Sequence, residues 1–189
     1  MIDIGELILA GFFFFTPAQA APIDIEFSNF DTDESVECLA LNMYYEARGQ
    51  GTVGLLAVSY VVLNRVKDKR FPNTICEVIK QGPIRESWKK DGTYYPIRNR
   101  CQFSWYCDGK SDNPKNKKLY KKLLTISKAL IYNIKDSFID ITDGALFYHA
   151  YYVTPAWSKV KYRTARIGDH IFYRWEAFID DVGDGDSHL

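Results

Sequence analysis

The sequence predicts a mainly α-helical α+β domain that ends in a small β-hairpin or sheet. Residues 34–47 carry apolar side chains at helical spacing, and residues 52–66 form a long apolar run. The last third of the chain is rich in strand-forming residues around Gly168-Asp169, a two-residue hairpin signal. A length of 189 residues suits one domain with a substantial core.

The N-terminus resembles an export signal. A short apolar run over residues 7–15 precedes Ala18-Gln19-Ala20, a sequence typical of signal-peptide cleavage sites. The run is shorter than the roughly 20 apolar residues of a membrane span. Because Asp3 and Glu6 stand where basic residues are usual, an uncleaved anchor and a misplaced start codon remain alternatives. We expect export, followed by cleavage after Ala20 and an acidic linker.

The helix of residues 34–47 carries Glu46, the centre of the functional hypothesis. Its expected buried face is apolar at i, i+3, i+4 and i+7 spacing: Val36, Leu39, Ala40, Met43 and Ala47. Glu46 lies seven residues after Leu39, at the edge of this stripe. Partial burial there would favour the neutral carboxylic acid and raise its pKa, as a general acid near neutral pH requires. The alternative is a surface glutamate paired with Arg48.

Two further helices are expected next. Residues 52–66 are apolar nearly all round, so we predict a buried central helix against which the Glu46 helix packs. Gly49 and Gly51, which allow left-handed geometry, separate the two. After a break at residues 71–74, a short helix is predicted over residues 75–80, with Pro72 at an early helical position.

Residues 81–110 show no clear period and are rich in Gly, Pro, Arg and aromatic residues. Long irregular stretches inside a compact domain usually have a function. The latter half has Cys101 and Cys107 at the two ends of a polar and aromatic run. We interpret this half as a pinned binding loop.

The cysteines favour disulfides over a metal site. Cys38, Cys76, Cys101 and Cys107 can pair in three ways, of which we favour Cys101–Cys107 with Cys38–Cys76. A zinc site is the rival hypothesis, but the chain has no C-x-x-C pair and only three histidines. Disulfides also suit an oxidising compartment, so no metal and no cofactor are expected.

The remaining elements are one helix and a β-rich segment. Asn113-Pro114 is predicted to open a helix whose lysines form a solvated face, with attraction to an anionic polymer as the alternative. Its apolar stripe is Leu119, Tyr120, Leu123, Ile126, Ser127, Leu130 and Ile131. Strands are predicted over residues 145–150, 160–167 and 170–175.

Several function classes are excluded by the residues present. The chain lacks a nucleophile elbow, a P-loop, a dinucleotide fingerprint and an H-E-x-x-H motif. Basic and acidic residues balance at 24 each, so no global field indicates nucleic acid as a partner. His149 and His170 are expected to be packed or hydrogen-bonded. A cysteine–histidine peptidase would need a free thiol beside one of them.

Seven short motifs, in order, carry a family resemblance. They are YEARG at 45–49, AV and VLNRV within 57–66, FPNTIC at 71–76, CQFSW at 101–105, GA and YHA within 144–150, VTPAW at 153–157 and IGDHIFY at 167–173. In this order they resemble the SleB-type cell wall hydrolases, a family that includes spore cortex-lytic enzymes and similar bacterial and phage domains. The resemblance covers about residues 36–175.

This resemblance implies a lysozyme-like fold and cleavage of peptidoglycan glycan strands between N-acetylmuramic acid and N-acetylglucosamine. It implies that Glu46 is catalytic and that the enzyme is a lytic transglycosylase, with a hydrolytic muramidase or a non-catalytic wall-binding module as alternatives. Gln50 departs from the acidic residue that the family often has, and we expect it to shape the loop. The expected organisation is signal peptide, linker, catalytic domain and acidic tail, over residues 1–20, 21–33, 34–178 and 179–189.

Other site residues follow from their chemistry. Gln102 and Ser104 could hydrogen-bond sugar amide and hydroxyl groups, whereas Trp105 and Tyr148 offer flat stacking faces. Tyr45 could contact either the acid or the sugar. Phe103, between two polar residues, is expected in the core. Candidates for a second carboxylate are Asp108, Asp112 and Asp143. We expect a monomer that acts on glycan strands in the periplasm or cell wall, encoded by a cell or a phage.

Overall fold

The computed structural model describes residues 32–133 and 139–175. Its elements are α1 (Asp33–Ala47), α2 (Gly51–Lys67), α3 (Ile75–Lys80), β1 (Ile84–Glu86), β2 (Tyr94–Pro96), η2 (Ser104–Cys107), α4 (Lys117–Asn133), β3 (Phe147–Ala150), η3 (Ala156–Lys159), β4 (Tyr162–Ile167) and β5 (His170–Arg174). The expected signal peptide, nearly all of the linker and the acidic tail lie outside the described residues. None of the described helices is long and apolar enough to cross a membrane.

Helix α1 begins at a side-chain cap and buries the face that the sequence predicts. Thr32 Oγ1 accepts a hydrogen bond from the Ser35 backbone N–H at 3.0 Å, which satisfies an otherwise free donor of the first turn. Leu39, Ala40, Met43 and Ala47 are fully buried or nearly so, whereas Val36 is only partly buried. Of the two glycines after the helix, only Gly51 has a positive φ, of 68°.

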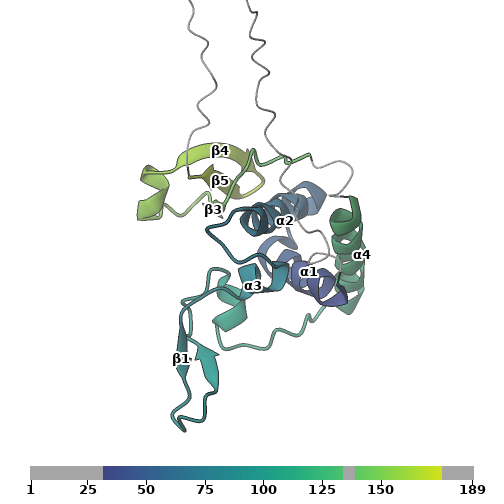
Figure 1. The fold of residues 1–189 in the computed structure, drawn as a ribbon. Helices are drawn as coiled ribbons and strands as arrows, with labels where there is room; N and C mark the ends of the chain where they lie inside the picture. Colours follow the sequence, from purple (N-terminus) through teal and green to yellow (C-terminus); the bar gives the residue numbers. More distant parts are fainter. Residues whose placement is uncertain (1–31, 134–138, 176–189) are drawn as a thin grey trace, which may run out of the picture.

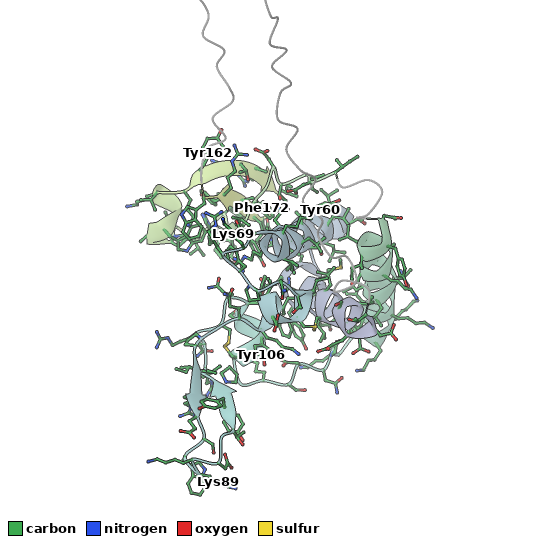
Figure 2. The ribbon with its side chains drawn as sticks, viewed as in Figure 1. Tyr60, Lys69, Lys89, Tyr106, Tyr162 and Phe172 are labelled. Atoms are coloured by element: carbon green, nitrogen blue, oxygen red, sulfur yellow. A yellow bond between two sulfur atoms is a disulfide. The ribbon has the colours of Figure 1, made fainter. Side chains whose placement is uncertain are left out.

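Helix α2 is the central element, as predicted from its apolar run. Val58, Val62 and Leu63 are fully buried in the cluster shared with α1. On another side, Ala57 and Val61 pack against Phe172 of the sheet, which lies between the strands and α2 (Figure 2). Burial of each large apolar side chain contributes about 1.5–3 kcal/mol to folding. Because α2 is buried on several sides, these contributions hold α1 and the sheet against it.

Helix α3 is short and is fixed at its start. Thr74 caps it by accepting the Glu77 backbone N–H at 3.3 Å. Pro72 therefore precedes the cap and is not an early helical residue, which corrects the prediction. The Cys38–Cys76 disulfide joins α1 to α3, and Cys101–Cys107 closes the polar and aromatic loop. This is the favoured pairing, and the described residues include no free cysteine.

The β1–β2 hairpin was not predicted. Its strands pair antiparallel, with Arg85 opposite Tyr95, and nearly all of its residues are exposed. The hairpin projects from the helices, with Lys89 near its tip (Figures 1 and 2). Strands of three residues with no buried face leave no alternating pattern in the sequence.

Helix α4 packs across α1 with an amphipathic face. It begins at Lys117 rather than at Asn113-Pro114, because the Asn116 side chain accepts the Leu119 backbone N–H at 3.0 Å and caps the first turn. Leu123, Ser127 and Ile131 are its buried residues. The lysines of the helix are exposed, as expected for a solvated face.

The C-terminal sheet confirms the predicted strands. Its order is β3-β5-β4, and both strand pairs are antiparallel. The β4–β5 turn is Gly168-Asp169, and Gly168 adopts the left-handed φ of 56° that such a turn requires. The sheet lies beside α2 on the opposite side of the helical layer from α4 (Figure 1).

Gln50 connects the helices to this sheet. Its Nε2 donates to Asp169 Oδ2 at 2.8 Å, and its Oε1 accepts the Asp169 backbone N–H at 3.0 Å. We call these two hydrogen bonds the Gln50 clasp. A side chain at Gly168 would place its Cβ 2.5 Å from Gln50 Oε1, so the clasp requires glycine there.

Candidate active site

Glu46 lies in a cavity of about 470 Å³ between the helical layer and the sheet. The last turn of α1 supplies the carboxylate, α2 supplies Arg65 and β3 supplies Tyr148. The remaining lining residues are Gln102, Phe103, Ser104, Phe147, His149, Ala150, Tyr152, Trp157 and His170. We call this cavity the Glu46 pocket.

The surroundings of Glu46 favour its neutral form. Burial is the largest influence and raises the pKa of the Glu46 carboxyl above its usual value. The Tyr148 hydroxyl, which donates to Glu46 Oε2 at 2.9 Å, and the Arg65 charge both lower that pKa, but less than burial raises it. Arg48 turns away from Glu46 and donates to the Tyr44 carbonyl oxygen at 3.4 Å. Glu46 is therefore not the ion-paired surface residue of the alternative hypothesis.

Arg65, like Tyr152 and Trp157, is a residue of this pocket that sequence reasoning missed. Its side chain is 5% exposed, and its Nε donates to the Leu146 carbonyl oxygen at 2.7 Å. The guanidinium carbon lies 5.4 Å from the centre of the Phe103 ring. Its Nη1 is buried without a hydrogen-bond partner among the described residues. Burial lowers the pKa of Arg65 to about 10, so the side chain stays cationic at neutral pH.

Tyr148 makes a contact that the sequence did not predict. Its ring packs against Phe103, His170 and Phe172, with the His170 ring centre 5.0 Å away. Burial and the nearby Glu46 raise the pKa of the Tyr148 hydroxyl well above 10. The hydroxyl therefore remains a donor toward Glu46 at any pH at which the protein would act.

The loop of residues 101–107 brings two polar side chains to the pocket. Gln102 and Ser104 are exposed and line the cavity, whereas Phe103 between them is 2% exposed and lies in the core, as predicted. The Cys101–Cys107 disulfide closes the loop, and the Gln102 backbone N–H donates to the Gln81 carbonyl oxygen at 2.9 Å. Both constraints fix the loop beside Glu46.

The two histidines of the pocket are hydrogen-bonded or packed. His149 Nδ1 lies 2.9 Å from the Ala150 carbonyl oxygen, which can only accept, so this nitrogen carries the proton. Its Nε2 then accepts from the Tyr173 hydroxyl at 3.0 Å. His170 is 8% exposed, and burial lowers its pKa. Both residues are the packed or hydrogen-bonded groups that the sequence led us to expect.

One group of potential metal ligands exists elsewhere among the described residues. Glu34 lies beside the sulfur atoms of Cys38 and Cys76. These two cysteines form a disulfide, so they cannot act as the thiolate ligands of a zinc site.

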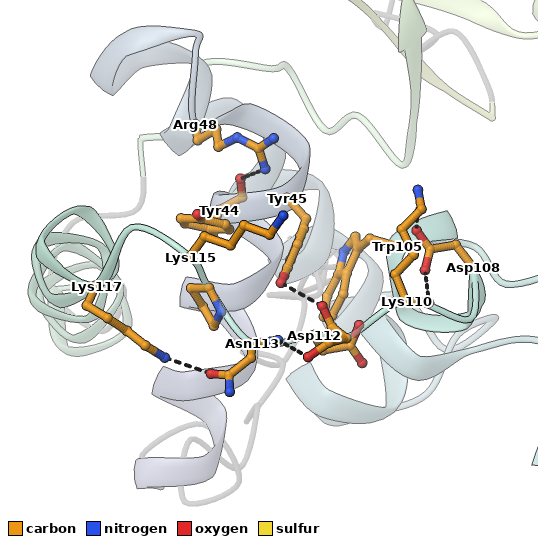
Figure 3. A pocket seen from close by; sticks show the side chains of 12 residues that line it. Tyr44, Tyr45, Arg48, Trp105, Asp108, Lys110, Asp112, Asn113, Lys115 and Lys117 are labelled. Atoms are coloured by element: carbon orange, nitrogen blue, oxygen red, sulfur yellow. Dashed lines mark hydrogen bonds and ion pairs between the residues drawn. The ribbon is translucent and has the colours of Figure 1, made fainter.

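A second, larger cavity lies beside the first and holds the other predicted site residues. Tyr45 and Trp105 stack with ring centres 4.9 Å apart and planes 16° apart, and both line a cavity of about 890 Å³ (Figure 3). Asp108 and Asp112 line this cavity too. We call it the Tyr45 pocket. The structure thus groups Glu46, Gln102, Ser104 and Tyr148 in one pocket, and places Tyr45 and Trp105 in the neighbouring one.

Comparison with known sequences agrees with this architecture. The family described as Cell Wall Hydrolase matches residues 49–173. The chain belongs to this family. The match begins three residues after Glu46, so it covers the remainder of the Glu46 pocket and not the glutamate itself.

Individual relatives named spore cortex-lytic enzymes are also similar to this chain. The chain is 34% identical over 83 residues to a spore cortex-lytic enzyme of Bacillus subtilis (strain 168), a match covering 42% of this chain and 27% of the relative. It is 28% identical over 142 residues to a spore cortex-lytic enzyme of Bacillus cereus, covering 75% of this chain and 44% of the relative. The chain spans less than half the length of these two relatives.

The fold of this chain is similar to that of a solved SleB catalytic domain. The crystal structure of the catalytic domain of the Bacillus cereus SleB protein superposes with a TM-score of 0.51 and 26% sequence identity. The superposition covers 76% of this chain and 91% of that domain. These comparisons confirm both the SleB-type family resemblance and the predicted fold class of this cell wall hydrolase.

Proposed function

We propose that this domain cleaves the glycan strand of peptidoglycan between N-acetylmuramic acid and N-acetylglucosamine, as a lytic transglycosylase with Glu46 as general acid and base. The observation that carries the proposal is the state of Glu46. It is the only carboxylate of the described residues that lines its pocket, and burial favours its neutral form.

In the first step Glu46 acts as an acid. It donates its proton to the glycosidic oxygen, the bond from that oxygen to C1 of the muramic acid breaks, and the N-acetylglucosamine side leaves as an alcohol. The positive charge that develops at C1 and the ring oxygen is typical of glycoside cleavage. The carboxylate formed at Glu46 is then stabilised by the Tyr148 hydroxyl and by the charge of Arg65.

In the second step Glu46 acts as a base. The C6 hydroxyl of the same muramic acid attacks C1, and its proton passes to the Glu46 carboxylate. The product is a 1,6-anhydromuramic end, no water is consumed, and Glu46 regains its acid form. One carboxyl group suffices for this sequence of steps.

The positions of the other carboxylates support transglycosylation over hydrolysis. Inverting hydrolysis would use a second carboxylate at about 6.5–9.5 Å from the acid, and retention would use a closer one. Asp108 and Asp112 line the Tyr45 pocket instead, and Asp143 accepts from Arg174 Nη1 at 2.8 Å. None of these three candidates lines the Glu46 pocket.

Substrate contacts in this proposal come from the pocket walls. Gln102 and Ser104 hydrogen-bond sugar amides and hydroxyls, and Trp157 and Tyr152 offer aromatic faces to the sugar rings. The relatives named spore cortex-lytic enzymes suggest wall material of this kind as the substrate class. Because peptidoglycan lies outside the cytoplasmic membrane, we propose that the protein acts there after export, as a monomer without a cofactor.

The substitution Glu46→Gln tests the assignment. It keeps the size of the side chain and removes the proton donor, so the release of soluble muropeptides from purified sacculi should fall by about 10²–10⁴-fold, the usual contribution of a general acid. At acid pH, where Glu46 of the parent is neutral as well, the thermal melt should stay close to that of the parent. Glu37→Gln, on an exposed position of the same helix, is the matched control and should keep full activity. Full activity of Glu46→Gln would refute the proposal.

Mass spectrometry of the released muropeptides separates the alternatives. Anhydro ends are one water lighter than the reducing ends that a hydrolytic muramidase would leave. A non-catalytic wall-binding module would sediment with sacculi and release nothing. Only anhydro products support the transglycosylase mechanism.

A further inference from the structure

The Tyr45 pocket and the Glu46 pocket are lined by residues that are neighbours in sequence. Tyr45 precedes Glu46 in the chain, and Trp105 follows Ser104. Consecutive Cα atoms are about 3.8 Å apart across a trans peptide bond, and the described residues contain no cis bond. The Tyr45–Trp105 stack therefore stands one residue away from both the acid and a predicted sugar contact.

The wall and floor of the Tyr45 pocket are fixed by internal contacts. Trp105 Nε1 donates to the buried Asn42 Oδ1 at 3.1 Å. The Tyr44 ring packs edge-on against Tyr45 at 5.1 Å, and its hydroxyl accepts the Asn116 backbone N–H at 3.0 Å. The pocket thus has a preformed aromatic surface, which lowers the entropy lost when a ligand binds.

The Tyr45 pocket carries charged side chains of both signs. Only some of them contact another residue that lines the pocket. The lining contains four cationic and two acidic side chains. Lys110 Nζ lies 3.3 Å from Asp108, and Lys117 Nζ donates to Asn113 at 2.7 Å. These contacts, drawn in Figure 3, leave three charged lining residues outside them: Arg48, Lys115 and Asp112.

Each of these three groups could take a ligand charge. The hydrogen bond of Arg48 to the Tyr44 carbonyl oxygen is long, at 3.4 Å, and its guanidinium lies over the Tyr44 ring. Lys115 is exposed and has no ion-pair partner within the described part of the chain. Burial and the neighbouring Asp108 raise the pKa of Asp112, because both disfavour its negative charge. A cation bound beside Asp112 would offset this unfavourable energy.

A ligand that satisfies this arrangement carries carboxylates, an amino group and short apolar parts. The peptide stem on the lactyl group of muramic acid has this chemistry. A stem of three to four residues extends to about 10–14 Å, at about 3.3–3.6 Å per residue. That length is several times the spacing of about 3.8 Å between the neighbouring Cα atoms of Tyr45 and Glu46, so a stem on a muramic acid beside Glu46 can extend toward the Tyr45 pocket.

We propose that the Tyr45 pocket binds the acidic peptide stem of the muramic acid being cleaved, with Arg48 and Lys115 contacting its carboxylates and Asp112 its free amino group. The proposal rests on the proposed function, because it places the muramic acid beside Glu46. It assigns the enzyme a preference for stem-bearing strands over bare glycan.

The first experiment compares two substrates made from the same sacculi. One batch of glycan strands keeps its stems, and the other is stripped by an amidase that cuts between muramic acid and peptide. We expect the wild-type protein to cleave the stem-bearing strands faster. The double variant Arg48→Gln/Lys115→Gln should lose about tenfold in kcat/KM on these strands and nothing on bare strands. Lys118→Gln, an exposed lysine outside the pocket, is the matched control and should not differ from the parent.

The second experiment tests the acidic side of the pocket. Acetylating the stem amino groups with acetic anhydride removes their charge and should slow the wild type on stem-bearing strands. Asp112→Asn should already be slow on unmodified stems and should not slow further after acetylation. This pairing of a chemical change with a substitution identifies the contact without relying on folding of a single variant.

The outcomes separate the two proposals. Equal loss by the double variant on both substrates, or no loss on either, would overturn stem binding and leave the proposed function intact. If the wild type cleaves neither strand, the proposed function fails. Calorimetric titration with the free tripeptide L-Ala-γ-D-Glu-meso-diaminopimelic acid then tests stem binding separately. Binding that the double variant weakens supports stem binding in the Tyr45 pocket, and absence of binding overturns it.

Discussion

The Glu46 pocket and the Tyr45 pocket differ in the charge of their lining residues and in how far these residues are buried. In the Glu46 pocket a single carboxyl group is enclosed by aromatic rings and strand β3, and burial favours its neutral form. In the Tyr45 pocket, cations and carboxylates stand at the surface and stay available to a ligand. Adjacent residues supply the two environments because consecutive helical positions point about 100° apart. Under the two proposals, one helix turn serves both acid chemistry and recognition of charge.

The Tyr45–Trp105 stack gives the largest expected effect on stability. Trp105→Ala removes a side chain that is 8% exposed, together with its stacking on Tyr45 and its hydrogen bond to Asn42. We expect the free energy of unfolding to fall by about 3–5 kcal/mol, as for other buried tryptophans, measured by urea denaturation. Trp88→Ala, at a hairpin residue that is 87% exposed, is the control and should change stability by less than about 0.5 kcal/mol. Similar losses of stability in Trp105→Ala and Trp88→Ala would contradict this structural role of Trp105.

The pH dependence of stability tests the enclosed acid. Burial raises the pKa of folded Glu46 above its unfolded value, so the folded state holds this proton over a pH range in which the unfolded state has released it. The contribution to stability is therefore fully present below the unfolded pKa and is lost as pH rises toward the folded one. Each pH unit between the two values corresponds to about 1.4 kcal/mol. Denaturation across pH 4–8 should show this loss in the parent and not in Glu46→Gln. If the free energies of unfolding of the parent and Glu46→Gln changed in parallel with pH, the raised pKa of Glu46 would be contradicted.

Two tyrosine hydroxyls, one from each pocket, give the smallest and most specific effect. The Tyr148 hydroxyl stabilises the charged form of Glu46, so Tyr148→Phe should raise the pKa of Glu46 further. In the proposed mechanism the alkaline limb of kcat/KM is where Glu46 loses its proton, so this limb should move to higher pH. Tyr45→Phe removes a weak 3.4 Å hydrogen bond to the Ser111 carbonyl oxygen and should leave the limb in place. A downward shift in Tyr148→Phe, or equal shifts in both, would contradict the difference between the pockets.

Local patterns predicted most of the fold. The edge position of Glu46 followed from helical spacing, because the residues that define the stripe are all within a few turns. The turn at Gly168-Asp169 and its flanking strands followed from residue type and alternation. The disulfide pairing also agreed, since a short loop with a cysteine at each end restricts the geometry.

Tertiary contacts were not predictable in the same way. Arg65 looked like one polar residue in an apolar helix, and only the packing of the sheet on α2 places it beside Glu46. Trp105 was expected to face the sugar together with Gln102 and Ser104, but the turn of η2 and the bond to Asn42 direct its ring to the next pocket. Such assignments depend on contacts more than sixty residues apart in the chain.

The Gln50 clasp has a consequence for how the enzyme responds to its substrate. Glu46 belongs to the helical layer and Tyr148 to the sheet, and the clasp joins these layers at residues 119 positions apart in sequence. Docking of the sheet and formation of the acid site are therefore one equilibrium. Under the proposed function, a sugar chain bound between the layers would raise the melting temperature by mass action, and a change that loosens the clasp would weaken its binding.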